Sequence, residues 1–284
     1  MVVSELISVC RRIIGNSSDS AALDAKVIVK SVLGADDVQL LIKRDETVPE
    51  SLCRKAEEMA EKRGEHIPLA YIIKQKEFMS LPFAVDFGVL IPRADTECIV
   101  EEIIKDVCEG YVLDIGCGSG AISVCVAKYI PNAKVYAVDI SDKAISIARQ
   151  NAENNGVSVE FTKADIFSYK TDMMFDCIVS NPPYIETAEL DSLMPDVKDY
   201  EPTVALDGGE DGLKFYRRII DFAKSNLKPR GRLYFELGWK QFDSVRELLI
   251  NNGFTDIKEI YDLAGIKRGC KAELEDFTNE KVFE

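Results

Sequence analysis

The chain has 284 residues with 49 acidic and 35 basic side chains, a formal net charge of −14, and 46% hydrophobic residues. This composition is typical of a globular protein with a sizeable core, in one large domain or a large and a small one. The acid excess argues against a broad nucleic-acid surface, which needs clustered Lys and Arg. No apolar run reaches membrane-spanning length and the start lacks a basic signal-peptide segment, so we expect a soluble cytoplasmic protein.

The acid excess is uneven along the chain. Residues 1–92 hold 12 basic and 14 acidic side chains, whereas the remainder holds 23 basic and 35 acidic ones. The first part is therefore nearly neutral and can meet a partner without strong repulsion.

The cysteines and the histidine exclude other kinds of site. The eight cysteines form no Cys-x-x-Cys pair, and His66 is the sole histidine of the sequence. We therefore expect reduced thiols, no metal site and no Ser/His or Cys/His catalytic pair.

The N-terminal part of the sequence has a helical pattern. Amphipathic runs and glycine stops predict helices over residues 4–14, 21–33, 36–42 and 51–63. We assign them to a small helical domain, residues 1–67. Over residues 68–92 the period changes, and strands are expected at 70–73, 77–79 and 82–87 in a linking β-hairpin.

Residues 93–284 alternate between strand and helix patterns and form the predicted catalytic domain. Strands are expected over 111–115, 134–140, 157–163, 175–180, 232–236, 256–261 and 267–274, and helices over 95–107, 121–129, 142–155, 213–226 and 242–252. Repeated β-α units predict an α/β fold, a Rossmann-like parallel sheet with helices on both faces.

A glycine-rich loop, Asp114-Ile-Gly116-Cys117-Gly118-Ser119-Gly120, follows the first strand of this sheet. Glycines let the backbone approach a ligand closely, and the helix that follows begins with free N–H donors. Ligands of such sheets lie beyond the carboxyl ends of the strands. There, Asp139 can accept ribose hydroxyls. Asp165 can take the exocyclic amine of an adenine, with Ile166 against the face of the base.

The loop by itself fits two classes of ligand. Gly116, Gly118 and Ala121 satisfy the dinucleotide pattern, with Asp139 as the ribose acid of a nicotinamide-dependent oxidoreductase. Asp114 favours the second class, because an acid two residues before the first glycine suits a ligand with an ammonium group. S-adenosylmethionine has one. A purely structural Asp114, hydrogen-bonded to loop amides, is compatible with this role.

The turn Asn181-Pro182-Pro183-Tyr184 ends the fourth strand. The two prolines fix φ, remove N–H donors and push Asn181 towards an extended conformation. The turn presents a carboxamide, free carbonyls and an aromatic ring, which suits a small planar polar group. A proline-stiffened loop without a ligand has the same spacing, so the turn alone does not decide its role.

Further motifs accompany the loop and the turn. They are Gly64-x-x-x-Pro68-x-x-Tyr71-Ile72, Glu77-Phe78, Ile91-Pro92-Arg93, Glu201-Pro202-x-x-Ala205-Leu206, Gly208-Gly209-x-Asp211-Gly212-Leu213, Glu236-Leu-Gly238-x-x-Gln241, Gly253-Phe254 and Asp262-x-Ala264-Gly265-x-x-Arg268. With them the chain resembles class I S-adenosylmethionine-dependent methyltransferases and, over nearly its whole length, the PrmC/HemK family of protein glutamine N5-methyltransferases. One departure is visible: the family often reads Pro-Arg-Pro-Glu-Thr-Glu where this chain has Pro92-Arg93-Ala94-Asp95-Thr96-Glu97.

The resemblance implies methyl transfer from S-adenosylmethionine to the side-chain amide of the glutamine in the Gly-Gly-Gln loop of class 1 peptide chain release factors. It implies that Gly116 to Gly120 and Asp139 hold the donor, with Ile166 near its adenine. Asn181 to Tyr184 would hold the glutamine. We expect the Asn181 side-chain oxygen and the Pro182 carbonyl to accept the amide N–H bonds, with Tyr184 packed against the amide.

Other functions share parts of this pattern. An adenine-N6 DNA methyltransferase uses a similar turn, but it must bind phosphates and flip a base, which the acid excess opposes. A ribosomal-protein glutamine methyltransferase has the same turn, and only the resemblance of the whole chain to the PrmC/HemK family separates the two functions. A binding module built on an inactive enzyme is opposed by the intact motifs. We expect a monomer without stable nucleic-acid or membrane partners.

Overall fold

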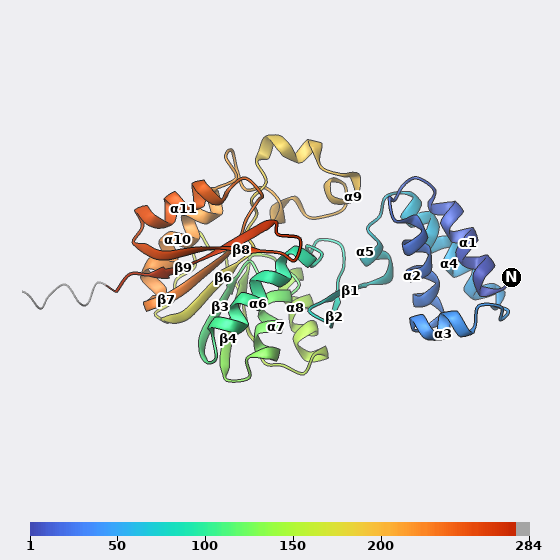
Figure 1. The fold of residues 1–284 in the computed structure, drawn as a ribbon, viewed down its shortest axis with the longest axis horizontal. Helices are drawn as coiled ribbons and strands as arrows, with labels where there is room; N and C mark the ends of the chain where they lie inside the picture. The colour runs from blue at the N-terminus through green and yellow to red at the C-terminus, as the bar shows by residue number, and fades with distance from the viewer. Residues whose placement is uncertain (277–284) are drawn as a thin grey trace, which may run out of the picture. The chain divides into compact units, whose positions relative to one another are not determined.

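The computed structural model describes residues 1–276, which divide into two compact units. The helical unit comprises residues 1–75 and 194–200, and the sheet unit comprises residues 76–193 and 201–276. Figure 1 labels most of the helices and strands of both. Within the described residues, no helix is long and apolar enough to cross a membrane.

The helical unit packs around its own apolar core, which includes Leu6, Ile28 and Ala56. Its helices are α1 (Val3–Ile14), α2 (Ala21–Leu33), α3 (Asp37–Ile42), α4 (Glu50–Gly64), α5 (Leu69–Ile73) and α9 (Pro195–Lys198). The four helices predicted over residues 4–63 are confirmed to within one residue at each end.

Residues 70–73 are helical, and their prediction as a strand was wrong. The amides of Tyr71 and Ile72 donate to the carbonyl of Pro68 at 3.0 and 3.2 Å, which forms the first turn of α5. Tyr71 is fully buried. Packing of this ring therefore outweighs the strand preference of the sequence Tyr-Ile-Ile.

A segment from late in the chain completes the helical unit. Arg63 of α4 is buried, with its Nε 2.8 Å from Asp24 and its Nη2 3.1 Å from Asp196 of α9. The Tyr200 hydroxyl donates to the Glu65 carbonyl at 2.7 Å. A buried cation thus holds residues 194–200 to the helices of residues 1–75.

The sheet unit has a seven-stranded sheet in the order β5-β4-β3-β6-β7-β9-β8. Its strands are β3 (Gly110–Ile115), β4 (Ala133–Asp139), β5 (Glu160–Lys163), β6 (Phe175–Ser180), β7 (Leu227–Glu236), β8 (Phe254–Tyr261) and β9 (Lys267–Leu274). Its main helices are α6 (Glu97–Asp106), α7 (Ala121–Tyr129), α8 (Asp142–Asn154), α10 (Lys214–Asn226) and α11 (Phe242–Asn251), and 3-10 turns span Ala94–Thr96, Thr187–Ser192 and Thr203–Ala205.

The Rossmann-like sheet is confirmed, but it is mixed, and the predicted parallel pairing holds for five of its seven strands. Strands β5, β4, β3, β6 and β7 pair in parallel, but β9 is antiparallel to both β7 and β8. Residues 262–266 join β8 to β9, and so short a connection permits a hairpin but no crossover.

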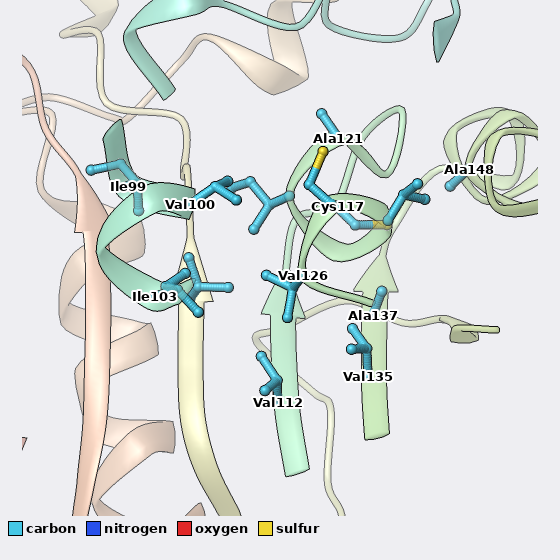
Figure 2. Close-up of a cluster of buried hydrophobic side chains, with 14 of the residues drawn as sticks. Ile99, Val100, Ile103, Val112, Cys117, Ala121, Val126, Val135, Ala137 and Ala148 are labelled. Carbon is cyan, nitrogen blue, oxygen red and sulfur yellow. The ribbon is translucent and has the colours of Figure 1, made fainter. Parts of the chain in front are cut away.

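Each face of the sheet has an apolar core, as the prediction of helices on both faces requires. Val112 and Leu113 are neighbours on β3 and point to opposite faces. Val112 packs with residues of α6 and α7, whereas Leu113 packs with residues of α10 and α11. Figure 2 shows part of the first cluster, in which labelled side chains of α6 and α7 gather on the same face of the sheet as Val112 of β3 and Val135 of β4.

The predicted hairpin is confirmed as β1 (Gln75–Phe78) paired with β2 (Leu81–Ala84). Met79 and Ser80 form its two-residue turn with φ of 50° and 59°, the left-handed conformation that matches the twist of a tight hairpin. Asn151 of α8 holds β2, because its Oδ1 accepts from the Ala84 amide at 2.7 Å.

Candidate active site

The loops after β3, β4 and β6 leave the sheet at one edge. Ile115, at the end of β3, pairs with Val138 of β4 on one side and with Ser180 of β6 on the other. The glycine loop, Asp139 and Asn181 therefore emerge at the same level. The chain runs outward from β3 to β5 and then returns to β6, a switch point that leaves a crevice for a ligand.

A cavity of about 330 Å³ lies in this crevice. It is lined by ten of the residues predicted from the sequence: Gly116, Cys117, Gly118, Ser119, Asp139, Asp165, Ile166, Asn181, Pro182 and Pro183. Three others, Asp114, Gly120 and Tyr184, do not line it. The structure thus brings the predicted donor residues and the Asn-Pro-Pro turn to one cavity.

Two glycines of the loop present open backbone. Gly116 and Gly118 have φ of 75° and 55°, and a Cβ built on either would meet nothing within 4 Å. Gly120 differs, because a Cβ there would lie 3.0 Å from the Cβ of Ala148 on α8. Gly116 and Gly118 therefore leave room for a ligand, whereas Gly120 allows α7 and α8 to pack.

Asp139 shapes the loop and keeps acceptor capacity. Its Oδ2 accepts from the Gly118 amide at 2.9 Å and its Oδ1 from the Ser141 amide at 2.8 Å. Burial raises the pKa of this carboxyl. A carboxylate has about four acceptor positions, so Asp139 keeps acceptor capacity for a hydroxyl of a ligand in the cavity.

Asp114 holds an unpaired buried oxygen behind the loop. Its Oδ2 accepts from the Ser123 amide at 3.1 Å, but Oδ1 has no hydrogen-bond partner among the described residues. Burial raises the pKa of this carboxyl to about 7. A buried carboxylate with one unpaired oxygen is costly. The site therefore fits a ligand with a cationic group, which would offset this charge.

The cavity lining includes two aromatic side chains, Phe167 and Phe215, that sequence reasoning missed. The rings of Phe167 and Phe215 meet edge to face at 5.4 Å, and the Lys214 Nζ lies 5.3 and 5.6 Å from them. Asp165 forms the turn before Phe167, since its Oδ1 accepts from the Phe167 amide at 2.9 Å. The position of Phe167 directly after Ile166 was the available signal.

Asn181 follows β6 directly and lines the cavity. Its Nδ2 donates to Thr96 Oγ1 at 3.3 Å, and the Thr96 hydroxyl donates to the buried carboxylate of Glu236. Ser180 fixes the strand end, because its hydroxyl donates to the Ile115 carbonyl at 2.6 Å. Thr96 and Glu236 both belong to motifs of the resemblance, yet nothing in their spacing predicted a role for them.

Tyr184 does not line the cavity, and it contacts Gln241 and Glu236. Gln241 Nε2 donates to the Tyr184 carbonyl at 2.8 Å, and the Tyr184 hydroxyl lies 3.4 Å from Glu236 Oε1. Burial raises the pKa of Tyr184. A Cβ on Gly212 would lie 2.5 Å from the Tyr184 carbonyl oxygen, so a glycine there lets the next loop support the turn.

Two residues that precede α6, Arg93 and Asp95, form ion pairs with residues from later in the chain. Arg93 lines the cavity and pairs with the buried carboxylate of Glu201. Asp95, the shortened acid of the family motif, has its Oδ2 2.8 Å from Arg268 Nη1. The departure at this position therefore still allows an ion pair.

The fold and the site together define a class I S-adenosylmethionine-dependent methyltransferase. Residues 93–195 match the family model "Methyltransferase small domain", and residues 5–73 match "PrmC N-terminal domain". The fold is similar to a crystal structure of a methyltransferase from Pyrococcus furiosus, with a TM-score of 0.54 and 21% identity over 71% of this chain and 92% of that one.

Sequence relatives show the family. The chain is 43% identical to the release factor glutamine methyltransferase of Geobacter sulfurreducens, over 88% of each chain. It is 38% identical to that of Clostridium acetobutylicum, over 86% of this chain and 88% of the other. The protein belongs to the release factor glutamine methyltransferase family.

Proposed function

We propose that the protein transfers a methyl group from S-adenosylmethionine to the side-chain amide nitrogen of a glutamine, the one in the Gly-Gly-Gln loop of class 1 peptide chain release factors. The observation that carries this proposal is the single cavity that the glycine loop and the Asn181-Pro182-Pro183 turn both line. The names of the curated relatives support the choice of substrate.

The donor half of the cavity would hold S-adenosylmethionine. When bound, this group supplies a methyl on a positively charged sulfur. Asp139 would accept the ribose hydroxyls, and the apolar side chain of Ile166 would lie against the adenine. Asp114 would offset the ammonium charge from behind the glycine loop.

The turn would position the acceptor amide. An amide nitrogen is a poor nucleophile, because its lone pair is delocalised into the carbonyl. Asn181 Oδ1 and the Pro182 carbonyl would accept the two N–H bonds and direct the lone pair at the methyl group. Both acceptors bind more strongly as positive charge develops on nitrogen, so they favour the transition state over the bound substrate. The donor would leave as neutral S-adenosylhomocysteine when its methyl–sulfur bond breaks. The methylated nitrogen, which is then cationic, would release its proton to water without a strong base.

Asp114→Asn should weaken donor binding without harming the fold. The amide keeps the shape and the acceptor for Ser123 but loses the charge, so donor affinity should fall by about 1.5–3 kcal/mol. The midpoint of thermal unfolding of the donor-free protein should stay or rise, because a buried unpaired acid is removed.

The same residue gives donor binding a pH dependence. Since the pKa of Asp114 is about 7 and a nearby cation favours the ionised acid, affinity should rise as the pH increases through neutrality. Calorimetry in buffers of different ionisation heat should detect proton release below about pH 7. An Asp114→Asn variant that retained both the affinity and its pH dependence would remove Asp114 from the donor site.

We also propose that the helical unit docks the protein substrate. The nearly neutral balance of residues 1–92 supports this role. So do Val38, Leu41 and Ile42 of α3, which are 66%, 72% and 74% exposed. Leu41→Asp should raise the KM for the release factor with little change in kcat, whereas Leu23→Asp on α2 serves as the exposed control. Equal KM values for both variants and the wild type would contradict docking at α3.

A transfer assay with labelled donor and three acceptors tests the choice of substrate. A release factor, ribosomal proteins and DNA should be compared under identical conditions, with label expected on the release factor. Label on DNA would instead favour an adenine methyltransferase. The proposal includes action in the cytoplasm, because the eight free thiols are typical of a protein in a reducing compartment. It also includes action as a monomer.

A further inference from the structure

The hydrogen bonds behind Asn181 determine which way its carboxamide faces. The Thr96 hydroxyl has one hydrogen, and it donates this hydrogen to Oε2 of Glu236. Thr96 Oγ1 can then only accept from Asn181, and the Asn181 Nδ2 lies 3.3 Å from it. The NH2 end of the carboxamide is therefore held at Thr96, which leaves Asn181 Oδ1 as the acceptor for a ligand.

Glu236 is the ionisable member of this chain of hydrogen bonds. It is 3% exposed at the end of β7, and burial, with Asp95 as a further cause, raises the pKa of its carboxyl to about 7. Besides Thr96, the groups that interact with it are Asn181, Tyr184 and Asp95. Tyr216 and Cys98 of α6 lie against it, and Arg268, which also pairs with Asp262, forms an ion pair with Asp95.

None of the neutral neighbours of Glu236 titrates near neutrality. Burial raises the pKa of Cys98 to about 11 and those of Tyr184 and Tyr216 further above their usual range. Asp95 and Asp262 both lie 2.8 Å from Arg268. Glu236 is therefore the group of this cluster whose charge changes around pH 7.

We propose that Glu236, acting through Thr96, is a positioning residue that holds Asn181 in the orientation needed for methyl transfer to an amide. The inference rests on the proposed role of the turn. An ionised Glu236 only accepts hydrogen bonds, so the chain runs from Asn181 to Thr96 to Glu236.

A protonated Glu236 allows the opposite arrangement. It can donate to Thr96 Oγ1, which releases the Thr96 hydrogen to bond Asn181 Oδ1. The NH2 end of Asn181 then faces the acceptor site and opposes the N–H groups of a substrate amide. With donor saturating, kcat should therefore rise as the pH increases through about 7 and Glu236 loses its proton.

Substitutions at Thr96 separate this role from simple packing. Thr96→Val keeps the shape but lacks the hydroxyl, and kcat should fall about tenfold or more while donor affinity stays unchanged. Thr96→Ser keeps the hydroxyl and should restore kcat and its pH profile. Glu236→Gln cannot ionise and should flatten the pH profile of kcat across neutrality. Wild-type kcat and pH profile in Thr96→Val, or a retained profile in Glu236→Gln, would overturn the inference.

A readout without turnover keeps the inference testable if the substrate proposal fails. The side-chain ¹⁵N–¹H signals of Asn181, assigned by their loss in Asn181→Ala, should titrate with a midpoint near the pKa of Glu236, about 7. The titration should disappear in Glu236→Gln and in Thr96→Val. Signals that do not titrate in the wild type would overturn the inference, whereas a wild type that titrates but fails to methylate release factors would overturn only the proposed function.

Discussion

Asn181→Ala should lower kcat about 10²–10³-fold, the scale measured when one preorganised hydrogen-bonding group is removed from a transition-state site. The alanine lacks the Oδ1 acceptor, so one N–H of the acceptor amide is unpaired as positive charge develops on its nitrogen. Donor affinity should change little, because the glycine loop and Asp139 remain in place. Single-turnover transfer and donor calorimetry on the same preparation measure the two effects.

Asn181→Asp is the matched control for this substitution. The aspartate keeps an acceptor oxygen at the position of Asn181 Oδ1 but lacks the NH2 group that donates a hydrogen bond to Thr96 Oγ1. The variant should therefore retain more activity than alanine. Normal turnover by Asn181→Ala would exclude the turn from the mechanism. A large loss of donor affinity instead would assign Asn181 to the donor half of the cavity.

Arg63→Ala should destabilise the helical unit by about 3–5 kcal/mol, because it leaves the buried carboxylate of Asp24 without its cation. Residues 194–200 should be held less firmly, since Asp196 loses its pair with Arg63 and the Tyr200–Glu65 hydrogen bond remains. Urea unfolding followed by circular dichroism gives the loss of stability, and proteolysis within residues 194–200 reports the loosening.

Arg54→Ala on the same helix is the control for Arg63. Its pair with Glu50 is exposed, and exposed pairs contribute about 0–1 kcal/mol. A similar stability for the two variants would show that the buried pair does not hold the unit together.

The sequence predicted the parts of the fold that depend on local patterns. Helices such as Ala121–Tyr129 and strands such as Phe175–Ser180 have both the expected period and clear stops, and their bounds agree with the structure. The glycine loop and the Asn181 turn were each predicted to follow a strand, and the register at Ile115 shows that these two strands end at the same level.

Features that depend on distant contacts were not predictable. Residues 70–73 have a strand pattern, but burial of the Tyr71 ring favours a helix there. The antiparallel direction of β9 depends on its pairing with β7, which is distant in the sequence. Thr96 and Glu236 are 140 residues apart, and a threonine and a glutamate have no spacing signal at that distance. Their role required the side-chain contacts.

The most direct test of the proposed function is the location of the transferred methyl group. A purified release factor should be incubated with the enzyme and isotopically labelled S-adenosylmethionine, digested, and its peptides fragmented in a mass spectrometer. We predict one labelled methyl on the side-chain amide of the glutamine in the Gly-Gly-Gln loop, and labelling about 10²–10³-fold slower with Asn181→Ala. Label on another residue of the release factor, or an unlabelled release factor with active enzyme, would contradict the proposed function.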